Sequence, residues 1–145
     1  MSSAKDLAVD TLAADLRVSL MKSARRLRAG NYDVEVSDAQ YSVLAVLDRQ
    51  GPCTARKLAL IEGVQPPSIS KTLSGLAERG LIQRTVDPAD GRQSIVQLTS
   101  PGRELVRETR RRRNAWLAGR LSELSADERA VLASAAEILR RIAAS

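Results

Sequence analysis

The chain has 145 residues, of which 43% are apolar and 28% charged, and a formal net charge of +6. The composition indicates a folded, mainly helical protein, and the positive charge suits a polyanionic partner such as DNA, RNA or a membrane surface. It has no histidine, no phenylalanine and one cysteine, which excludes zinc fingers, histidine-based acid–base catalysis and an internal disulfide, and argues against base stacking on aromatic side chains. No apolar stretch approaches the ~20 residues that span a bilayer, and the amino terminus lacks an apolar signal core, so we expect a cytoplasmic protein with no membrane partner.

The first part of the chain predicts two helices. Apolar residues at helical spacing predict a long first helix over residues 5–30, whose narrow apolar stripe suits packing along another helix. The capping-box pattern Ser37-Asp38-Ala39-Gln40 then opens a second helix. Leu44 and Leu47 are expected on its inner face, and Gly51-Pro52 ends it.

A third, short helix follows. Thr54 is a suitable N-cap residue, Leu58 and Ile61 are expected to face inward, and Gly63 ends the helix. Cys53, in the turn before this helix, is expected to be a small, partly buried packing residue.

The fourth helix is predicted over residues 66–79, because prolines fit the first turn of a helix, where the amide they lack would be unbonded. At about 100° per residue, one face holds Ile69, Leu73 and Leu76, and this face is expected to be buried. The opposite face holds Pro67, Ser70, Lys71 and Ser74. These small polar side chains and one cation suit the major groove of DNA, and Gly75 on the outward flank would allow close approach of the backbone. An ordinary amphipathic surface helix would give the same pattern.

A β-hairpin is predicted next, with strands over residues 81–86 and 94–98. Arg84, Asp90 and Arg92 place two cations beside a carboxylate at or near its exposed turn. An arginine held by Asp90 would be positioned to enter a minor groove, with Asp90 as its orienting partner. The alternative is a surface salt bridge of little energetic value. Short helices followed by a charged hairpin are the element order of a winged helix-turn-helix.

Two more helices are predicted, a long one from Ser100-Pro101 and a last one opened by the capping box at Ser125. The resulting fold class is mainly α, with six helices and a small β-hairpin wing. The first, fifth and sixth helices carry apolar stripes that a monomer of this length could hardly cover, which favours a homodimer over a monomer with every stripe folded inward. At least one arginine of the run Arg110–Arg113 is expected to lie near the apolar stripe of the fifth helix. This arginine could belong to an anion-binding pocket, or the run could form a solvated basic face.

Asp90-Gly91-Arg92 is followed after five further residues by Leu98-Thr99. This wing sequence resembles the Asp-x-Arg-x5-Leu-Thr signature of MarR-type (multiple antibiotic resistance) regulators, and residues 76–84 resemble the segment before it. The resemblance implies one domain over 1–145, with a DNA-binding region over 37–99 and dimerisation helices over 5–30 and 101–144. It also implies a homodimer that binds a pseudo-palindromic operator in double-stranded DNA and represses genes until a signal lowers its affinity.

The resemblance further assigns residues to the DNA site. Arg92 corresponds to the wing-tip residue of the minor groove and Asp90 to its partner. The positions of the recognition helix correspond to Gln65, Ser68, Ser70, Lys71 and Ser74.

Family members often bind small aromatic anions in a crevice between the dimerisation helices and the winged domain. The candidate effector residues here are Tyr41, Arg113 and Trp116. The family's redox cysteine lies near the start of the first helix, where this chain has none, so a sensor role is not transferred to Cys53. No nucleophile–base pair, metal cluster or phosphate loop is found, so neither an enzyme nor a cofactor is expected. The alternative to a regulator is a winged-helix protein-interaction module that binds an acidic partner.

Overall fold

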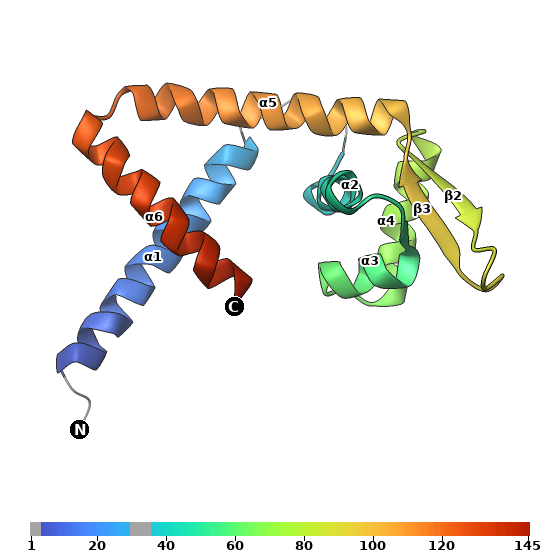
Figure 1. The fold of residues 1–145 in the computed structure, drawn as a ribbon, viewed down its shortest axis with the longest axis horizontal. Helices are drawn as coiled ribbons and strands as arrows, with labels where there is room; N and C mark the ends of the chain where they lie inside the picture. The colour runs from blue at the N-terminus through green and yellow to red at the C-terminus, as the bar shows by residue number, and fades with distance from the viewer. Residues whose placement is uncertain (1–3, 30–35) are drawn as a thin grey trace. The chain divides into compact units, whose positions relative to one another are not determined.

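The computed structural model of the chain describes residues 4–29 and 36–145 (Figure 1). Within these residues it has six helices and one three-stranded antiparallel sheet with strand order β1-β3-β2, which confirms the predicted mainly α fold class. The elements in chain order are α1 (Ala4–Ala29), α2 (Asp38–Gln50), β1 (Cys53–Thr54), α3 (Ala55–Glu62), α4 (Pro66–Glu78), β2 (Ile82–Val86), β3 (Ser94–Leu98), α5 (Ser100–Ser122) and α6 (Ala126–Ala144). Gly30, the predicted end of the first helix, lies outside the described residues.

The helix starts form as their sequences predict. The side-chain oxygens of Ser37, Thr54 and Ser125 each accept a hydrogen bond from a backbone N–H three residues on, at 3.1–3.2 Å. Such caps satisfy amides that have no partner within the helix. Gly63 closes α3 in the left-handed conformation, with φ of 64°, where a residue with a Cβ would be strained.

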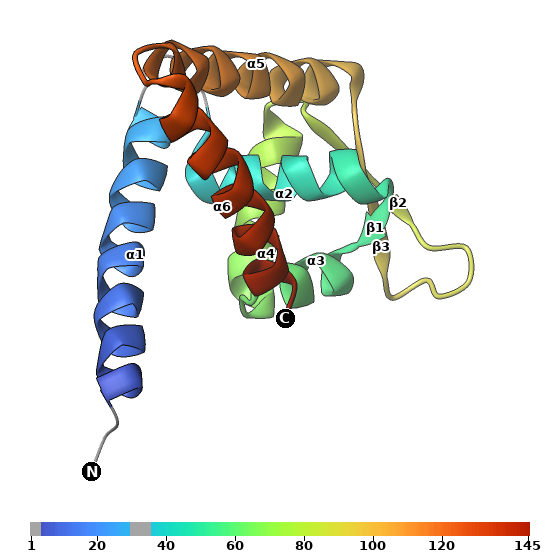
Figure 2. The ribbon, with the colours of Figure 1, turned by 60° about the vertical axis from the view of Figure 1, so that its left-hand side comes forward.

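The chain divides into two compact units, residues 31–111 and residues 1–30 with 112–145, and α5 contributes to both. The first of these, which we call the winged unit, contains α2, α3, α4 and the sheet. Its aliphatic core is built around side chains that are almost fully buried: Val43, Leu44, Leu58, Leu73, Leu76, Val96 and Val106. Figure 2 shows the β2–β3 hairpin projecting from this core.

The prediction that the Ile61 side chain faces the core is wrong. Ile61 is 41% exposed, whereas Leu58 and Ala59 are buried. Because α3 is only eight residues long, these two side chains fill the narrow face that it turns to the core, and Ile61 falls at its edge.

The second unit, which we call the helical unit, contains α1, the end of α5 and α6. No residue of α6 is buried in the single chain, although α6 carries a stripe of aliphatic side chains. Val131 is 67% exposed and Ile138 48% exposed. No helix in the described ranges is both long enough and apolar enough to cross a membrane.

Candidate nucleic-acid interface

The helix α4 has one buried face and one open face. Pro66 and Pro67 occupy its first two positions, as predicted. Ile69, Leu73 and Leu76 are buried in the core, which confirms the predicted inner face. All the side chains assigned to DNA contact on or before this helix are exposed: Gln65, Pro67, Ser68, Ser70, Lys71 and Ser74. The helix is therefore held by its apolar side and leaves a polar side available to a ligand.

The sequence predicted that Gly75 would face DNA, but in the structure it faces α2. It does not lie on an open flank, because a Cβ at this position would come within 2.7 Å of Nε2 of Gln40 in α2. The same Gln40 side chain accepts the backbone N–H of Ser37 in the capping box, at 3.0 Å. The missing side chain at Gly75 thus lets α4 pack closely on the start of α2.

A shallow cleft of about 420 Å³ lies along this contact, beside the polar face of α4. It is lined by Ser37, Gln40, Lys71, Thr72, Ser74, Gly75 and Glu78. The start of α2 therefore borders the candidate interface, which sequence reasoning missed because the α2–α4 contact joins residues far apart in the chain.

The wing is a regular two-stranded hairpin in which Ile82 pairs with Leu98 and Val86 with Ser94. Its turn is ordered by backbone hydrogen bonds, one from the amide of Asp87 to the carbonyl of Gln93 and one from the amide of Gln93 to the carbonyl of Asp90. Arg84, Asp90 and Arg92 are all exposed. The two arginines form no ion pair with any described residue.

Asp90 does not hold the guanidinium of Arg92. Its carboxylate oxygen Oδ1 instead accepts the backbone N–H of Arg92 at 3.0 Å. An aspartate in a turn readily bonds the backbone two residues on, so Asp90 fixes the turn conformation. Asp90 therefore sets where the Arg92 side chain starts and leaves its charge available.

The root of the wing is anchored by Thr99, to which sequence reasoning gave no separate role. The Thr99 hydroxyl donates to the carbonyl of Gly80 at 2.6 Å and accepts the backbone N–H of Gly102 at 3.2 Å. Its own amide donates to the carbonyl of Leu81 at 3.1 Å. One residue thus ties the chain after α4, the end of β3 and the start of α5 together.

Arg110 and Arg111, the first two residues of the arginine run in α5, form ion pairs. Arg110 lies 3.2 Å from Asp48 of α2, and Arg111 lies 2.8 Å from Glu108. The hydrogen bond and the charge of Glu108 raise the pKa of Arg111 above its ordinary value. Arg113 is half-buried, in agreement with the expectation that one cation of the run lies near the apolar stripe.

The three candidate effector residues are divided between the units. Tyr41 is half-buried against the core of the winged unit, while Arg113 and Trp116 belong to the helical unit. Trp116 packs under the guanidinium of Arg120, whose Cζ is 5.6 Å from the ring centroid, and lines a groove of about 850 Å³ between α1 and α5. An effector site that joins all three residues stays a prediction.

Cys53 is buried and pairs in β1 with Val96, so it packs in the core as expected. No group of three or more potential ligand residues that could hold a metal ion occurs among the described side chains.

A helix-turn-helix with an open polar second helix and a hairpin wing defines a winged-helix DNA-binding protein. The model of the MarR family matches residues 36–94 of this chain. An HTH-type transcriptional regulator of Mycobacterium tuberculosis is 41% identical over 128 residues, covering 88% of this chain and 90% of the relative. The chain belongs to the MarR family of transcriptional regulators, a family of regulators and not of enzymes.

Solved structures agree with this assignment. A transcriptional regulator protein from Pseudomonas aeruginosa has a TM-score of 0.85 and 34% identity, covering 98% of each chain. The PcaV transcriptional regulator of Streptomyces coelicolor, solved in complex with its natural ligand, has a TM-score of 0.67 and 30% identity, covering 100% of this chain and 99% of that one.

Proposed function

We propose that this protein is a homodimeric repressor that binds a pseudo-palindromic operator and is released from it by a small aromatic or anionic effector. The DNA-binding region is residues 37–99, and the dimerisation helices are residues 5–30 and 101–144. In each half-site, α4 lies in the major groove and the wing reaches the adjacent minor groove.

The observation that carries the proposal is the division of α4 into a buried aliphatic face and an exposed polar face. Lys71 supplies a cation for a phosphate, and Ser70 and Ser74 supply short hydrogen-bonding groups that let the helix sit deep in a groove about 12 Å wide. Arg84 and Arg92 add two exposed cations on the wing, where the negative potential of a minor groove attracts arginine.

Support for the dimer comes from the helical unit. Large aliphatic side chains of α1 and α6 are well exposed in the single chain: Val9, Leu12, Leu20, Met21, Val131, Leu132, Ile138 and Ile142. Apolar surface of this extent is characteristic of an interface. Two-fold symmetry then presents two copies of α4 about 34 Å apart, which matches successive major grooves on one side of the duplex.

Support for the effector comes from the relative that was solved with its natural ligand. The residues proposed for it are Tyr41, Arg113 and Trp116, of which Arg113 and Trp116 lie on α5 and Trp116 lines the groove of the helical unit. The Arg113 guanidinium would bond the anionic group of the effector.

The test is selection of bound fragments from a genomic library, followed by fluorescence anisotropy over a range of salt concentrations. The proposal expects one selected fragment with two half-sites, bound about 10³-fold or more tightly than a scrambled duplex. Its log–log salt slope should be about −0.9 per phosphate contacted. Equal, weak binding to every polyanion would instead indicate a module for acidic partners. A screen for compounds that dissociate the complex tests the effector.

A further inference from the structure

The side chain of Gln40, in the first turn of α2, is bonded at one atom and free at another. Its Oε1 accepts the backbone N–H of Ser37 at 3.0 Å, as part of the capping box. Its Nε2 makes no hydrogen bond to any residue that the structure describes. Because the bond at Oε1 orients the amide, the two N–H groups of Nε2 are held ready for an acceptor.

The free Nε2 lies against α4, where a Cβ added at Gly75 would come within 2.7 Å of it. Gln40 lines the cleft of about 420 Å³ beside the polar face of α4, together with Lys71 and Ser74. Neither the Lys71 ammonium nor the Ser74 hydroxyl bonds another side chain in the described ranges. The cleft thus combines donors from two elements, and one of them is a cation.

The cleft lining also includes an acid, Glu78. Its side chain is exposed and lies seven residues after Lys71, which is about 10 Å further along the helix axis. Salt and water screen an exposed charge over such a distance. Asp38, in the same turn of α2 as Gln40, does not line the cleft. The end of the cleft near Lys71 therefore attracts an anion.

The position of the cleft suits a strand of DNA. With α4 in the major groove, the two sugar–phosphate strands that border the groove pass on either side of the helix. The start of α2 lies beside α4 along the cleft. The strand on that side would therefore bring its phosphates to Gln40.

We propose that this cleft binds one backbone phosphate of the operator, which accepts hydrogen bonds from Nε2 of Gln40, the Lys71 ammonium and the Ser74 hydroxyl. The inference rests on the proposed function, because it takes α4 to lie in the major groove. It adds α2 to the elements that contact DNA. Phosphate contacts fix the register of a protein on the duplex without reading its sequence, so Gln40 holds α4 in place in the groove.

The test uses the full-length protein, its selected operator fragment and fluorescence anisotropy. Gln40→Glu replaces the free N–H groups by an oxygen that repels phosphate. It keeps an acceptor for the Ser37 amide, since glutamate and glutamine serve a capping box equally. We expect operator binding to weaken by about tenfold or more. The thermal unfolding midpoint should not fall, because a carboxylate is favourable at the start of a helix.

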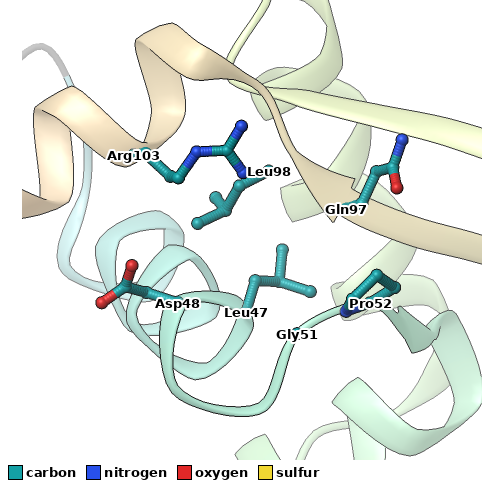
Figure 3. Close-up of a pocket in the computed structure, with 7 residues that line it drawn as sticks. All are labelled: Leu47, Asp48, Gly51, Pro52, Gln97, Leu98 and Arg103. Carbon is teal, nitrogen blue, oxygen red and sulfur yellow. The ribbon is translucent and has the colours of Figure 1, made fainter.

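The matched control is Gln50→Glu, the same change of amide to carboxylate at an exposed position in the last turn of α2. Gln50 lies about 15 Å along the helix axis from Gln40. Figure 3 shows this end of α2, from Asp48 to the turn at Gly51 and Pro52, and no residue of α4 lines the hollow there. Gln50→Glu should bind the operator like the wild type.

A second measurement identifies the phosphate. A methylphosphonate linkage carries no charge, and it is placed at each position of the operator in turn. At the bound phosphate it should weaken binding of the wild type by about tenfold or more. On that duplex alone, Gln40→Glu and the wild type should agree within about twofold, because the group that distinguishes them has been removed.

The proposal is overturned if Gln40→Glu binds the operator as tightly as Gln50→Glu, or if no methylphosphonate position equalises Gln40→Glu and the wild type. Either result leaves the proposed repressor function intact, since the wild type still binds its operator. A wild type that binds the operator no more tightly than a scrambled duplex would instead contradict the proposed function, and this inference with it.

Discussion

Arg92 at the wing turn carries a charge that the fold does not use. Its backbone amide is fixed by Asp90, while its side chain is exposed and forms no ion pair in the part of the chain that the structure describes. Arg92→Ala should therefore leave the thermal unfolding midpoint unchanged. It should weaken operator binding by about tenfold or more and make the salt slope shallower by about one unit, as for the loss of one groove or phosphate contact.

The matched control for this change is Arg107→Ala, which removes an equal charge from an exposed site on α5. Anisotropy titrations at three salt concentrations separate the two variants. If Arg92→Ala and Arg107→Ala lose the same small amount of affinity, Arg92 contributes only to the overall charge and the wing assignment fails.

Gly102 in the first turn of α5 is a position where only glycine fits. A Cβ there would overlap the carbonyl oxygen of Leu81, a backbone atom that cannot rotate away. Gly102→Ala should lower the free energy of unfolding by about 1–3 kcal/mol, in the range of an overpacked core position. Urea denaturation followed by circular dichroism measures this change.

Gly119 in the same helix provides the comparison. A Cβ there meets no atom within 4 Å in the single chain. Gly119→Ala should therefore be neutral or raise the free energy of unfolding by up to about 1 kcal/mol, because alanine favours a helix. Equal effects at the two glycines would mean that the tight contact at Gly102 is not a constraint.

The wing is held to the rest of its unit by the hydroxyl of Thr99, at the base of the hairpin. Thr99→Val keeps the shape of the side chain but removes the bonds to Gly80 and Gly102. We expect a loss of about 1–2 kcal/mol in the free energy of unfolding, and weaker operator binding because the wing is held less firmly against α4. Thr85→Val, an exposed β2 position whose side chain makes no hydrogen bond to described residues, should change neither quantity. An unchanged stability of Thr99→Val would contradict this anchoring role.

The helices could be predicted because their signals are local. The capping residues Ser37, Thr54 and Ser125 mark the true starts of α2, α3 and α6, since a cap bonds an amide only three residues away. The strand β1 was not predicted. It has only two residues and exists because Cys53 and Thr54 pair with β3, far along the chain.

The features of the candidate DNA site could be predicted from the sequence only where they depend on residues close together in the chain. The buried and exposed faces of α4 follow from helical periodicity within one segment. The surroundings of Gly75 and the anchoring by Thr99 depend on Gln40 and Gly80, which lie in other elements. The backbone bond of Asp90 is local, but a turn sequence does not distinguish a carboxylate that bonds the backbone from one that holds an arginine.

No residue of α6 is buried in the single chain, so its apolar stripe is left exposed. The double variant Val131→Glu with Ile138→Glu places two charges one heptad apart on this stripe. Because burying unpaired charges is costly, we expect it to dissociate or unfold the proposed homodimer and to abolish binding to a two-half-site operator. Leu60→Glu is the matched control, since Leu60 is a 75% exposed aliphatic residue on α3 of the winged unit. Sedimentation equilibrium should find Leu60→Glu dimeric, and a double variant that stays dimeric at the wild-type concentration would exclude α6 from the dimer interface.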